Sequence, residues 1–382
     1  MKKIKIFLSA GEASGDLHAG ELMEALAREA ERLGMTADFT YLGGDVMARA
    51  AGHAPLIHYR DMAYMGFSEV IRNLGKVRKN LQTAREAIKR ERPDAVILVD
   101  YPSFNLRLAR TARKLGIPVY YYIAPKVWAW KKWRVRQLRR YCRKILSILP
   151  FEIEFFKRHG VNATYVGNPS LSEIDSRACR LTSRATLLSK AGLPQETRFI
   201  ALVPGSRHGE IRNNLPLMAE AAARFPAYTP IVAGAPGIEP GYYRRFTDLP
   251  VLEGETFSLM AHADAALVTS GTATLECALL GTPQAVCYRS GGSRLAYNIM
   301  KRILTIPFVS LPNLIAGREI VRELLLHLCT PYAMASELQR LLPGGNGRDR
   351  QLADYRQLRS ILGTEDAPTN AASVILSDLN HA

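Results

Sequence analysis

Apolar runs of strand length alternate along this chain with amphipathic stretches of helix length. The run 4–10 is followed by residues 16–34, where apolar side chains recur at helical spacing until Gly34. The same criteria predict further helices at 106–115, 215–225, 272–280 and 349–362. They predict further strands at 39–42, 95–99, 119–123, 145–149, 163–166, 199–203, 231–233, 251–252, 265–269 and 284–288. This alternation is typical of βαβ units and indicates an α/β fold with parallel sheets.

The alternation breaks once, at Gly167-Asn168-Pro169, and resumes at residue 199. The residues between, 169–198, are polar and are predicted to connect two domains. We therefore expect an N-terminal domain over 1–170 and a second α/β domain over 171–345, followed by a helical tail over 346–382.

The composition is that of an ordinary globular protein, with 47% hydrophobic and 23% charged residues. Lys and Arg number 51 against 35 Asp and Glu, so the formal net charge is +16 and an anionic partner is expected. The five cysteines are scattered and are expected to be buried thiols. We expect neither a secretory signal nor a transmembrane helix, because the apolar runs are short or interrupted by charge, Gly and Pro.

Two loops of the first half carry polar residues directly after strands, where open parallel sheets bind ligands. The loop Gly11-Glu12-Ala13-Ser14-Gly15-Asp16 leads into a helix whose N-terminus favours an anion or sugar hydroxyls. A tight turn with Asp16 as N-cap is the competing interpretation. Asp100 ends a wholly apolar strand, where burial would raise its pKa and suit it to general base catalysis. A structural Asp that caps the next helix is the alternative.

Two loops of the second half suit a diphosphate. Arg207 follows a Gly-Ser turn at a strand end, and guanidinium forks onto phosphate oxygens. The segment Ser270-Gly271-Thr272 precedes a helix whose main-chain N–H groups could bind phosphate, with Glu276 placed to accept from a ribose diol. Thr272 and Glu276 could instead merely support the helix. The chain has no D-x-D triplet, so the commonest metal site on a nucleotide diphosphate is missing and no metal is expected.

Five segments together resemble the lipid-A-disaccharide synthase family. They are GEASGD (11–16), YYIAPKVWAWKKWR (121–134), PGSRHGEI (204–211), TSGTATLE (269–276) and LPNLIAG (311–317). The resemblance implies a metal-independent inverting glycosyltransferase without cofactor, with the GT-B fold of two Rossmann-like domains that face each other across a cleft. It implies condensation of UDP-2,3-diacylglucosamine with 2,3-diacylglucosamine 1-phosphate, with release of UDP, at the inner face of the cytoplasmic membrane of Gram-negative bacteria.

The resemblance also assigns roles to residues of this chain. Asp100 matches the carboxylate proposed as base, and Arg207, Glu276 and Asn313 match residues of the UDP-sugar site. Gly11, Glu12, Ser14, Gly15 and Asp16 lie in the matching first loop. The chain departs from the family at Ser103, where many members carry a second acid. The resemblance further implies that the tail packs back on an N-terminal domain, with a possible homodimer.

Most of the net charge lies in one stretch. Residues 101–151 contain thirteen Lys and Arg and no acid. Drawn as a helix, residues 127–146 place apolar side chains on one face, with Arg136, Arg140 and other cations opposite and Trp133 among the cations. An aromatic residue in a basic face is typical of an anchor on anionic lipid, although a solvated helix face is the plainer explanation. The second candidate for lipid contact is 62–81, with Met65 and Phe67, and a stripe of this kind is more often core.

Two rival functions remain open at this point. A basic nucleic-acid-binding protein would account for the charge, but the loops suit a small phosphorylated ligand. A UDP-sugar epimerase of the same architecture would account for the nucleotide loops, but for neither the basic stretch nor the Met-containing segment.

Overall fold

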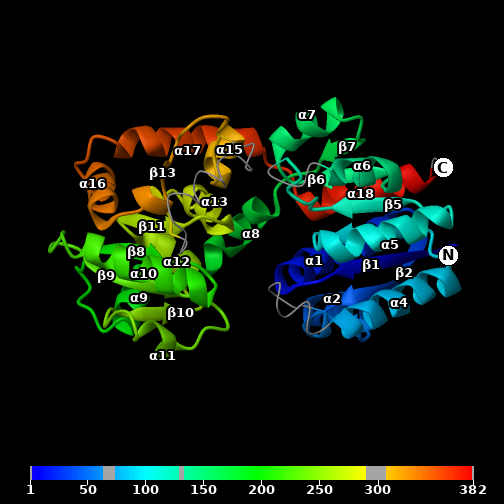
Figure 1. Ribbon diagram of the computed structural model, residues 1–382, viewed down its shortest axis with the longest axis horizontal. Helices are drawn as coiled ribbons and strands as arrows, with labels where there is room; N and C mark the ends of the chain where they lie inside the picture. The colour runs from blue at the N-terminus through cyan, green and yellow to red at the C-terminus, as the bar shows by residue number, and fades with distance from the viewer. Residues whose placement is uncertain (1, 63–73, 129–132, 290–306, 381–382) are drawn as a thin grey trace. The chain divides into compact units, whose positions relative to one another are not determined.

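The structure is a computed structural model that describes residues 2–62, 74–128, 133–289 and 307–380. The chain divides into two units, Met1–Pro169 with Thr364–Ala382, and Ser170–Gly363. Each unit is an α/β layer structure around its own parallel sheet (Figure 1).

Unit 1 contains a seven-stranded sheet in the order β3-β2-β1-β4-β5-β6-β7. Its strands are β1 (Lys2–Ala10), β2 (Met35–Gly43), β3 (Ile57–His58), β4 (Ala95–Val99), β5 (Val119–Tyr122), β6 (Lys144–Ser147) and β7 (Ala163–Tyr165). All neighbouring pairs are parallel, with Val99 opposite Tyr122 where β4 meets β5. The central strands read as unbroken apolar runs because both faces of the sheet are covered.

Helices cover both faces of this sheet (Figure 1). One face packs against α1 (Ala13–Arg32), α2 (Asp45–Ala51) and α18 (Ala367–Asn380). The other packs against α4 (Leu74–Glu91), α5 (Pro102–Lys114), α6 (Arg134–Tyr141) and α7 (Pro150–Arg158). A short 3₁₀ helix, η1 (Tyr59–Asp61), follows β3. Along β4, Ile97 and Val99 enter the first core while Val96 and Leu98 enter the second, as alternation in a strand requires.

Unit 2 contains a six-stranded sheet in the order β10-β9-β8-β11-β12-β13. Its strands are β8 (Phe199–Val203), β9 (Thr229–Gly234), β10 (Val251–Glu253), β11 (Ala265–Thr269), β12 (Gln284–Tyr288) and β13 (Arg322–Leu325). Its helices are α8 (Pro169–Arg177), α9 (Arg184–Lys190), α10 (His208–Ala222), α11 (Pro240–Tyr243), α12 (Thr256–His262), α13 (Thr272–Leu279), α15 (Leu311–Ala316), α16 (Pro331–Leu341) and α17 (Arg348–Leu362), with 3₁₀ turns η2 (Ala178–Arg180) and η3 (Leu326–Leu328).

The α/β fold with two parallel sheets is confirmed, and the strands of the sheet centres lie where the hydrophobic pattern predicts them. The pattern misses the two-residue β3 and the edge strand β13. It is wrong for 169–198, which holds α8 and α9 rather than a plain connection. The strands β3 and β13 lie at the edges of their sheets and are too short, at two and four residues, to form a clear apolar run.

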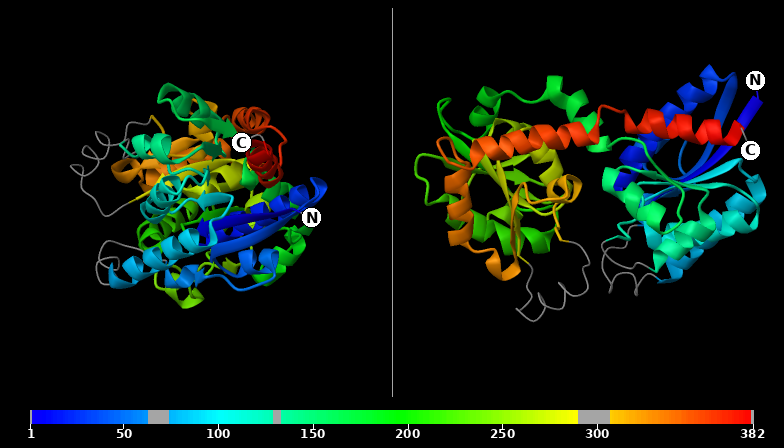
Figure 2. Two further views of the ribbon diagram at one scale, coloured as in Figure 1. Left: turned by 90° about the vertical axis from the view of Figure 1, so that its right-hand side faces the viewer. Right: turned by 90° about the horizontal axis from the view of Figure 1, so that it is seen from above.

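The segment 346–382 does not behave as one tail. Helix α17 packs within unit 2, against α13 and α15, whereas α18 packs against α1 in unit 1 (Figure 2). Asp378 of α18 accepts from the Tyr120 hydroxyl at 2.7 Å and pairs with Arg143 at 2.5 Å. The chain therefore leaves unit 2 at residue 363 and returns to unit 1 for one helix.

Contrary to the interpretation of the sequence pattern, the basic stretch 127–146 is not one continuous helix. The helix α6 spans Arg134–Tyr141 alone, and Lys144–Ser147 is strand β6. Val135 and Leu138 are buried as predicted, but Arg143 belongs to the ion pair with Asp378 rather than to a free cationic face.

Candidate active site

Each sheet has one place where the strand order reverses, between β1 and β4 in unit 1 and between β8 and β11 in unit 2. Ligands of open parallel sheets bind outside the carboxyl ends of the strands at this switch point. The four loops that follow these strands are the four that the sequence singles out: 11–16, 100–105, 204–207 and 270–272. The two sheets therefore present their chemistry at equivalent positions.

Asp100 lies directly after β4 in a left-handed backbone conformation, with φ 42°, and Tyr101 follows with φ 45°. Such values are uncommon for residues with a side chain and need support from the surroundings. Two buried groups supply it, because Asn105 Nδ2 and the Tyr121 hydroxyl both donate to the Asp100 carbonyl oxygen, at 2.8 and 2.6 Å. Asn105 in turn accepts from Ser9 Oγ of β1 at 2.7 Å. The turn is therefore held from both neighbouring strands.

Asn105 and Tyr121 are functional positions that the sequence reasoning missed. Both are buried, and both fix the main chain of Asp100 rather than its carboxylate. A polar Asn within the apolar face of α5 is the signal that could have revealed one of them.

The carboxyl group of Asp100 has an altered proton affinity. Burial raises its pKa to about 6, the neighbouring Glu12 carboxylate adds to the increase, and Lys126 opposes it. Asp100 is therefore largely ionised at neutral pH yet basic enough to accept a proton. This confirms the expectation that burial at the strand end raises the pKa of Asp100.

The first loop lies against the Asp100 turn. A side chain on Gly11 would meet the Tyr101 ring, since a Cβ there would lie 2.3 Å from Tyr101 Cγ. Glu12 is half-buried at the N-terminus of α1, and Ser14 is exposed. The structure thus brings the Asp100 turn and the Gly11–Glu12 turn together, as equivalent positions on adjacent strands require.

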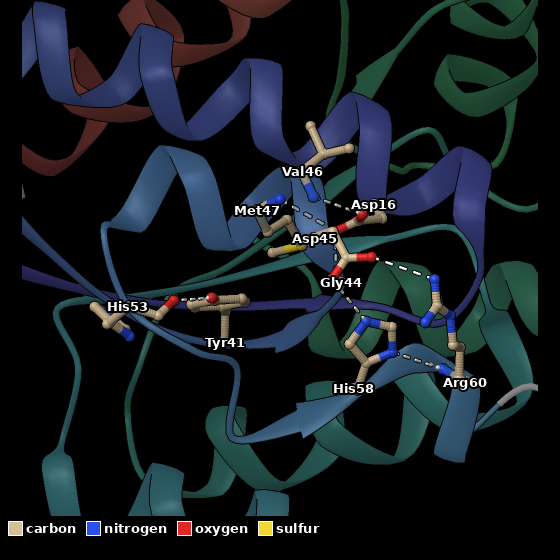
Figure 3. A network of polar contacts seen from close by, with 9 residues as sticks. All are labelled: Asp16, Tyr41, Gly44, Asp45, Val46, Met47, His53, His58 and Arg60. Carbon is tan, nitrogen blue, oxygen red and sulfur yellow. Dashed lines mark hydrogen bonds and ion pairs between the residues drawn. The ribbon is translucent and has the colours of Figure 1, made fainter.

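Asp16 has a structural task that neither sequence interpretation foresaw. It lies inside α1 rather than at its N-cap, and its carboxylate caps a different helix, α2 (Figure 3). Its oxygens accept from the N–H groups of Gly44, Val46 and Met47 at 2.6, 3.0 and 3.2 Å. Gly44 has no room for a side chain, because a Cβ would lie 2.3 Å from the Tyr59 ring. We conclude that Asp16 joins α1 to α2.

The two loops of unit 2 that the sequence singles out, 204–207 and 270–272, carry exposed residues. Arg207 has 71% of its side chain exposed, with its guanidinium 3.8 Å from Glu210. Gly205 adopts φ 110° and allows Glu210 to fold back and accept from the Ser206 N–H at 3.1 Å. The backbone conformation at Gly205 is one that favours glycine. Two residues later, the Arg207 side chain points away from the core.

The second of these loops, 270–272, leads into α13. Gly271 and Thr272 are exposed, Ser270 and Glu276 are half-buried, and the N-cap residue of the helix, Gly271, has no side chain with which to cap it. The Thr274 hydroxyl donates to the Gly271 carbonyl at 2.8 Å and stiffens the turn. A Cβ on Gly271 would meet nothing within 4 Å, so space remains above the loop.

The side-chain amide of Asn313 is engaged within its own loop. It is fully buried, and its Nδ2 donates to the Val321 carbonyl and to Glu323, both at 2.9 Å. Its Oδ1 accepts from the N–H groups of Ile320 and Val321 at 2.7 and 2.9 Å. An amide makes about four such bonds, so its capacity is used up. In this structure Asn313 organises its own loop, and its expected contact with UDP stays a prediction.

The basic helix presents part of the expected surface. Trp133 is 57% exposed, and Arg136 and Arg140 are exposed beside it. A surface hollow of about 750 Å³ is lined by Trp133, Val135, Arg136, Arg139, Arg158, His159 and Gly160. Met65 and Phe67 lie outside the described residues. The ends of that segment, Met62 and Leu81, belong to the core.

Within the described part of the chain, no cluster of three or more His, Cys, Asp or Glu could hold a metal ion. No helix in the same ranges is long and apolar enough to cross a membrane. The cysteines are all free thiols, of which Cys179 is exposed and Cys142 half-buried, so the expectation that all are buried is wrong for these two.

Comparison with known proteins extends this picture. The family model for lipid-A-disaccharide synthetase matches residues 6–374. The lipid-A-disaccharide synthase of Myxococcus xanthus is 40% identical over 381 residues, which cover 97% of each chain. Among solved structures, the calicheamicin glycosyltransferase CalG4 is similar with a TM-score of 0.60 at 16% identity, covering 100% of this chain and 99% of that one. The UDP-GlcNAc 2-epimerase from Neisseria meningitidis, bound to UDP-GlcNAc, is similar with a TM-score of 0.57 at 13% identity and 100% coverage of both chains.

The two structural similarities concern the fold, which is the GT-B arrangement of two Rossmann-like domains. The sequence similarity reaches further, because it spans nearly the whole chain at a level that structural analogy alone does not give. The chain belongs to the lipid-A-disaccharide synthase family and, like the members of that family, is a glycosyltransferase of lipid A disaccharide synthesis.

Proposed function

We propose that the protein condenses UDP-2,3-diacylglucosamine with 2,3-diacylglucosamine 1-phosphate to give lipid A disaccharide 1-phosphate and UDP. The observation that carries this proposal is Asp100, a carboxylate whose pKa burial raises to about 6 at the switch point of the unit 1 sheet. The identity of the substrates is inferred from family membership, and the identity of the base is inferred from the geometry of the site.

The reaction needs one proton transfer and one displacement. Asp100 takes the proton of the acceptor 6-hydroxyl as its oxygen bonds to C1 of the donor sugar. The bond from C1 to the UDP oxygen breaks on the opposite face, which inverts the anomeric centre. General base catalysis of this kind contributes about 10² to 10⁴ in rate.

Unit 2 is proposed to bind the UDP part of the donor. Arg207 is exposed at the end of β8, and the open N-terminus of α13, with Ser270, Gly271 and Thr272, ends β11. A flexible guanidinium and a helix N-terminus together suit a leaving diphosphate without a metal ion. Glu276, one turn into α13, is proposed to accept from the ribose.

The loop that holds Asn313 supports this site indirectly. Ser270 Oγ donates to the Val309 carbonyl at 3.4 Å, and Glu323 accepts from the Val309 and Ser310 N–H groups and from Asn313. Asn313 and Glu323 thus fix the segment that lies against the phosphate loop.

We further propose that α6 docks the protein on the cytoplasmic face of the inner membrane. Trp133, Arg136 and Arg140 are exposed together, and the neighbouring hollow is lined by cations without an acid. Anionic lipid headgroups fit this surface. The homodimer remains a prediction.

The test is incubation of the purified protein with both acylated substrates and no added metal, with detection of the disaccharide and of UDP. Release of UDP only in the presence of the acceptor supports the transferase, whereas UDP-sugar isomerisation without acceptor supports an epimerase. Asp100→Ala should keep UDP affinity and lose turnover, and Arg207→Ala should weaken UDP binding in calorimetry. Near-normal turnover of Asp100→Ala would remove Asp100 from the catalytic role.

A further inference from the structure

Helix α6 begins with a buried cation for which the described residues provide no anionic partner. Arg134 is 8% exposed, and its Nε is buried without an acceptor in the same ranges. A guanidinium carries several N–H donors, and the described part of the chain accepts one of them, through the bond from Arg134 Nη2 to Ser103 Oγ at 3.0 Å. Residues 101–151 contain no acid, so no carboxylate of this stretch compensates the charge. A buried charge of this kind is costly unless an anion pairs with it.

Ser103, the residue that this cation contacts, lies in the first turn of α5 and is exposed. Pro102 has no N–H to donate. The N–H groups of Phe104 and Asn105 both donate to the Tyr101 carbonyl oxygen, at 3.2 and 3.0 Å. The Ser103 N–H is therefore left without an acceptor among the described residues, where no side chain caps this helix N-terminus either. The free N–H and the helix dipole make the turn electropositive.

We propose that the Arg134 guanidinium, the Ser103 hydroxyl and the Ser103 N–H together form a binding site for a phosphate group. A guanidinium forks onto phosphate oxygens, and N–H groups at a helix N-terminus bind the same oxygens. The two kinds of donor converge because one guanidinium nitrogen lies at hydrogen-bond distance from the serine hydroxyl. Burial also lowers the pKa of Arg134, as expected for a charge that a bound anion would stabilise.

The phosphate that we assign to this site is the 1-phosphate of the acceptor sugar. This step rests on the proposed function, in which Asp100 takes the proton of the acceptor 6-hydroxyl. Ser103 follows Asp100 by three residues, so their Cα atoms are at most about 11 Å apart. The acceptor carries its 6-hydroxymethyl group and its 1-phosphate on the two carbons that flank the ring oxygen. A single sugar can therefore contact the base with one group and this site with the other.

The departure of this chain from its family at Ser103 is what leaves the site open. An acid at position 103, which many members carry, would pair with Arg134 from within the protein. With serine at this position, the guanidinium keeps its remaining donors for an external anion. The site is therefore a property of this chain rather than of the whole family, and one substitution should close it.

The first experiment measures kcat and the KM of each substrate for the wild type, Ser103→Asp and Ser103→Asn. The new carboxylate would occupy the guanidinium and repel the phosphate. Ser103→Asp should therefore raise the KM of the acceptor roughly tenfold to hundredfold, the range of one charge-assisted hydrogen bond, and leave the KM of the UDP donor unchanged. Ser103→Asn is neutral and nearly equal in size, and its acceptor KM should stay near that of the wild type.

The second experiment measures binding without turnover. Calorimetry uses glucosamine 1-phosphate, which has the ring and the phosphate but no acyl chains, and this binding should be lost in Ser103→Asp and in Arg134→Gln. Arg110→Gln removes an exposed cation from the same helix, α5, and should bind like the wild type. Inorganic phosphate and vesicles that contain phosphatidic acid are the parallel probes for a free phosphate and for a lipid headgroup.

Four results would overturn the proposal. They are an unchanged acceptor KM in Ser103→Asp, no binding of glucosamine 1-phosphate to the wild type, inorganic phosphate bound as tightly as the sugar phosphate, and weaker vesicle binding of Ser103→Asp with an unchanged acceptor KM. The third would assign the site to free phosphate, and the fourth to a lipid headgroup. Should Arg134→Gln fail to fold, Ser103→Asp decides, because it keeps the arginine.

Failure of the proposed function is recognised separately. In that case the wild type forms no disaccharide from the two acylated substrates, whereas the calorimetric comparison of the wild type with Ser103→Asp needs no turnover. Loss of glucosamine 1-phosphate binding in Ser103→Asp would then still support the phosphate site, without its link to the base.

Discussion

At the scale of single residues, the site is built from side chains that hold main chain in place. Asn105 and Tyr121 position Asp100 by donating hydrogen bonds to its main-chain carbonyl oxygen. Their role is therefore to hold the main chain rather than to contact a substrate. Asn313 acts in the same way in unit 2. Buried polar groups with saturated hydrogen bonds are costly to move, so they define where the exposed groups act.

Asp100 is predicted to reduce the stability of the protein at neutral pH. Its folded-state pKa, about 6, is above the ordinary value, so the folded state resists ionisation of this group. Asp100→Asn should therefore raise stability by about 1–2 kcal/mol, less than the full shift implies because the group is partly exposed. The gain is complete above pH 6 and shrinks as pH falls toward the unfolded pKa. Thermal unfolding at pH 7.5 and 5.0 measures it, and an equal or larger gain at pH 5.0 contradicts the argument.

Ser103, where the family often has an acid, lies beside a buried cation. Arg134 is 8% exposed and donates to Ser103 Oγ at 3.0 Å, while its Nε is buried without a partner among the described residues. Burial lowers the pKa of Arg134. An acid at position 103 would compensate this charge.

We expect Ser103→Asp to raise the free energy of unfolding by about 1–3 kcal/mol, and with it the melting temperature. The reason is that a carboxylate would pair with a charge that is already buried. Ser103→Asn is the neutral control of nearly equal size and should not reproduce the gain. Equal melting temperatures for the two variants would show that Arg134 is satisfied by other means.

At the scale of elements, single carboxylates on helices join those helices to other elements of unit 1. Asp16 of α1 caps α2. Asp378 of α18 binds Tyr120, which lies in β5, and Arg143, which directly precedes β6. Asp16 therefore joins two helices near the carboxyl ends of the strands, and Asp378 attaches α18 near the amino ends of β5 and β6.

Asp16→Ala should destabilise unit 1 by about 1–2 kcal/mol, because three N–H groups at the start of α2 lose their acceptor. Asp16→Asn keeps one acceptor oxygen and should lose less. Thermal unfolding, with kcat and KM measured well below the transition, separates this from substrate binding. An unchanged melting temperature with a raised KM would instead place Asp16 in the acceptor site.

At the scale of the whole molecule, most of the net charge of +16 comes from one stretch of unit 1, residues 101–151, which holds thirteen Lys and Arg and no acid. Part of it is already committed, since Arg143 pairs with Asp378 and Arg134 is buried. The exposed remainder on α6, beside Trp133, is the part that suits a lipid surface.

The triple variant Trp133→Ser, Arg136→Gln, Arg140→Gln should sediment less with liposomes that contain phosphatidylglycerol. Each basic residue near an anionic surface contributes about 1 kcal/mol, so loss of two cations alone predicts roughly a thirtyfold weaker association at low salt. Arg113→Gln with Lys114→Gln removes equal charge at the end of α5 and serves as the control. Equal losses in both variants would indicate non-specific attraction rather than docking by α6.

The sequence by itself determined the architecture and the positions of the loops. Buried parallel strands must be apolar on both faces, so β1, β4, β8 and β11 stand out as runs, and polar residues after them mark the ligand edge. Asp100, Arg207 and the loop at 270–272 were found in this way. The family resemblance could also be recognised from the sequence, because its motifs are short continuous segments of the chain.

Only the tertiary structure decided which polar residues face a ligand and which hold the fold. Asp16 stands in a motif that follows a strand and Asn313 in the motif 311–317, yet their partners come from 44–47 and 320–323. The split of α17 from α18 and the hydrogen bond from Trp128 to Glu152 likewise depend on contacts between distant segments. The hydrogen-bond partners of a buried side chain can come from any segment that lies close to it in the folded chain. A local sequence pattern therefore shows that a buried polar group needs a partner, but not which residue provides it.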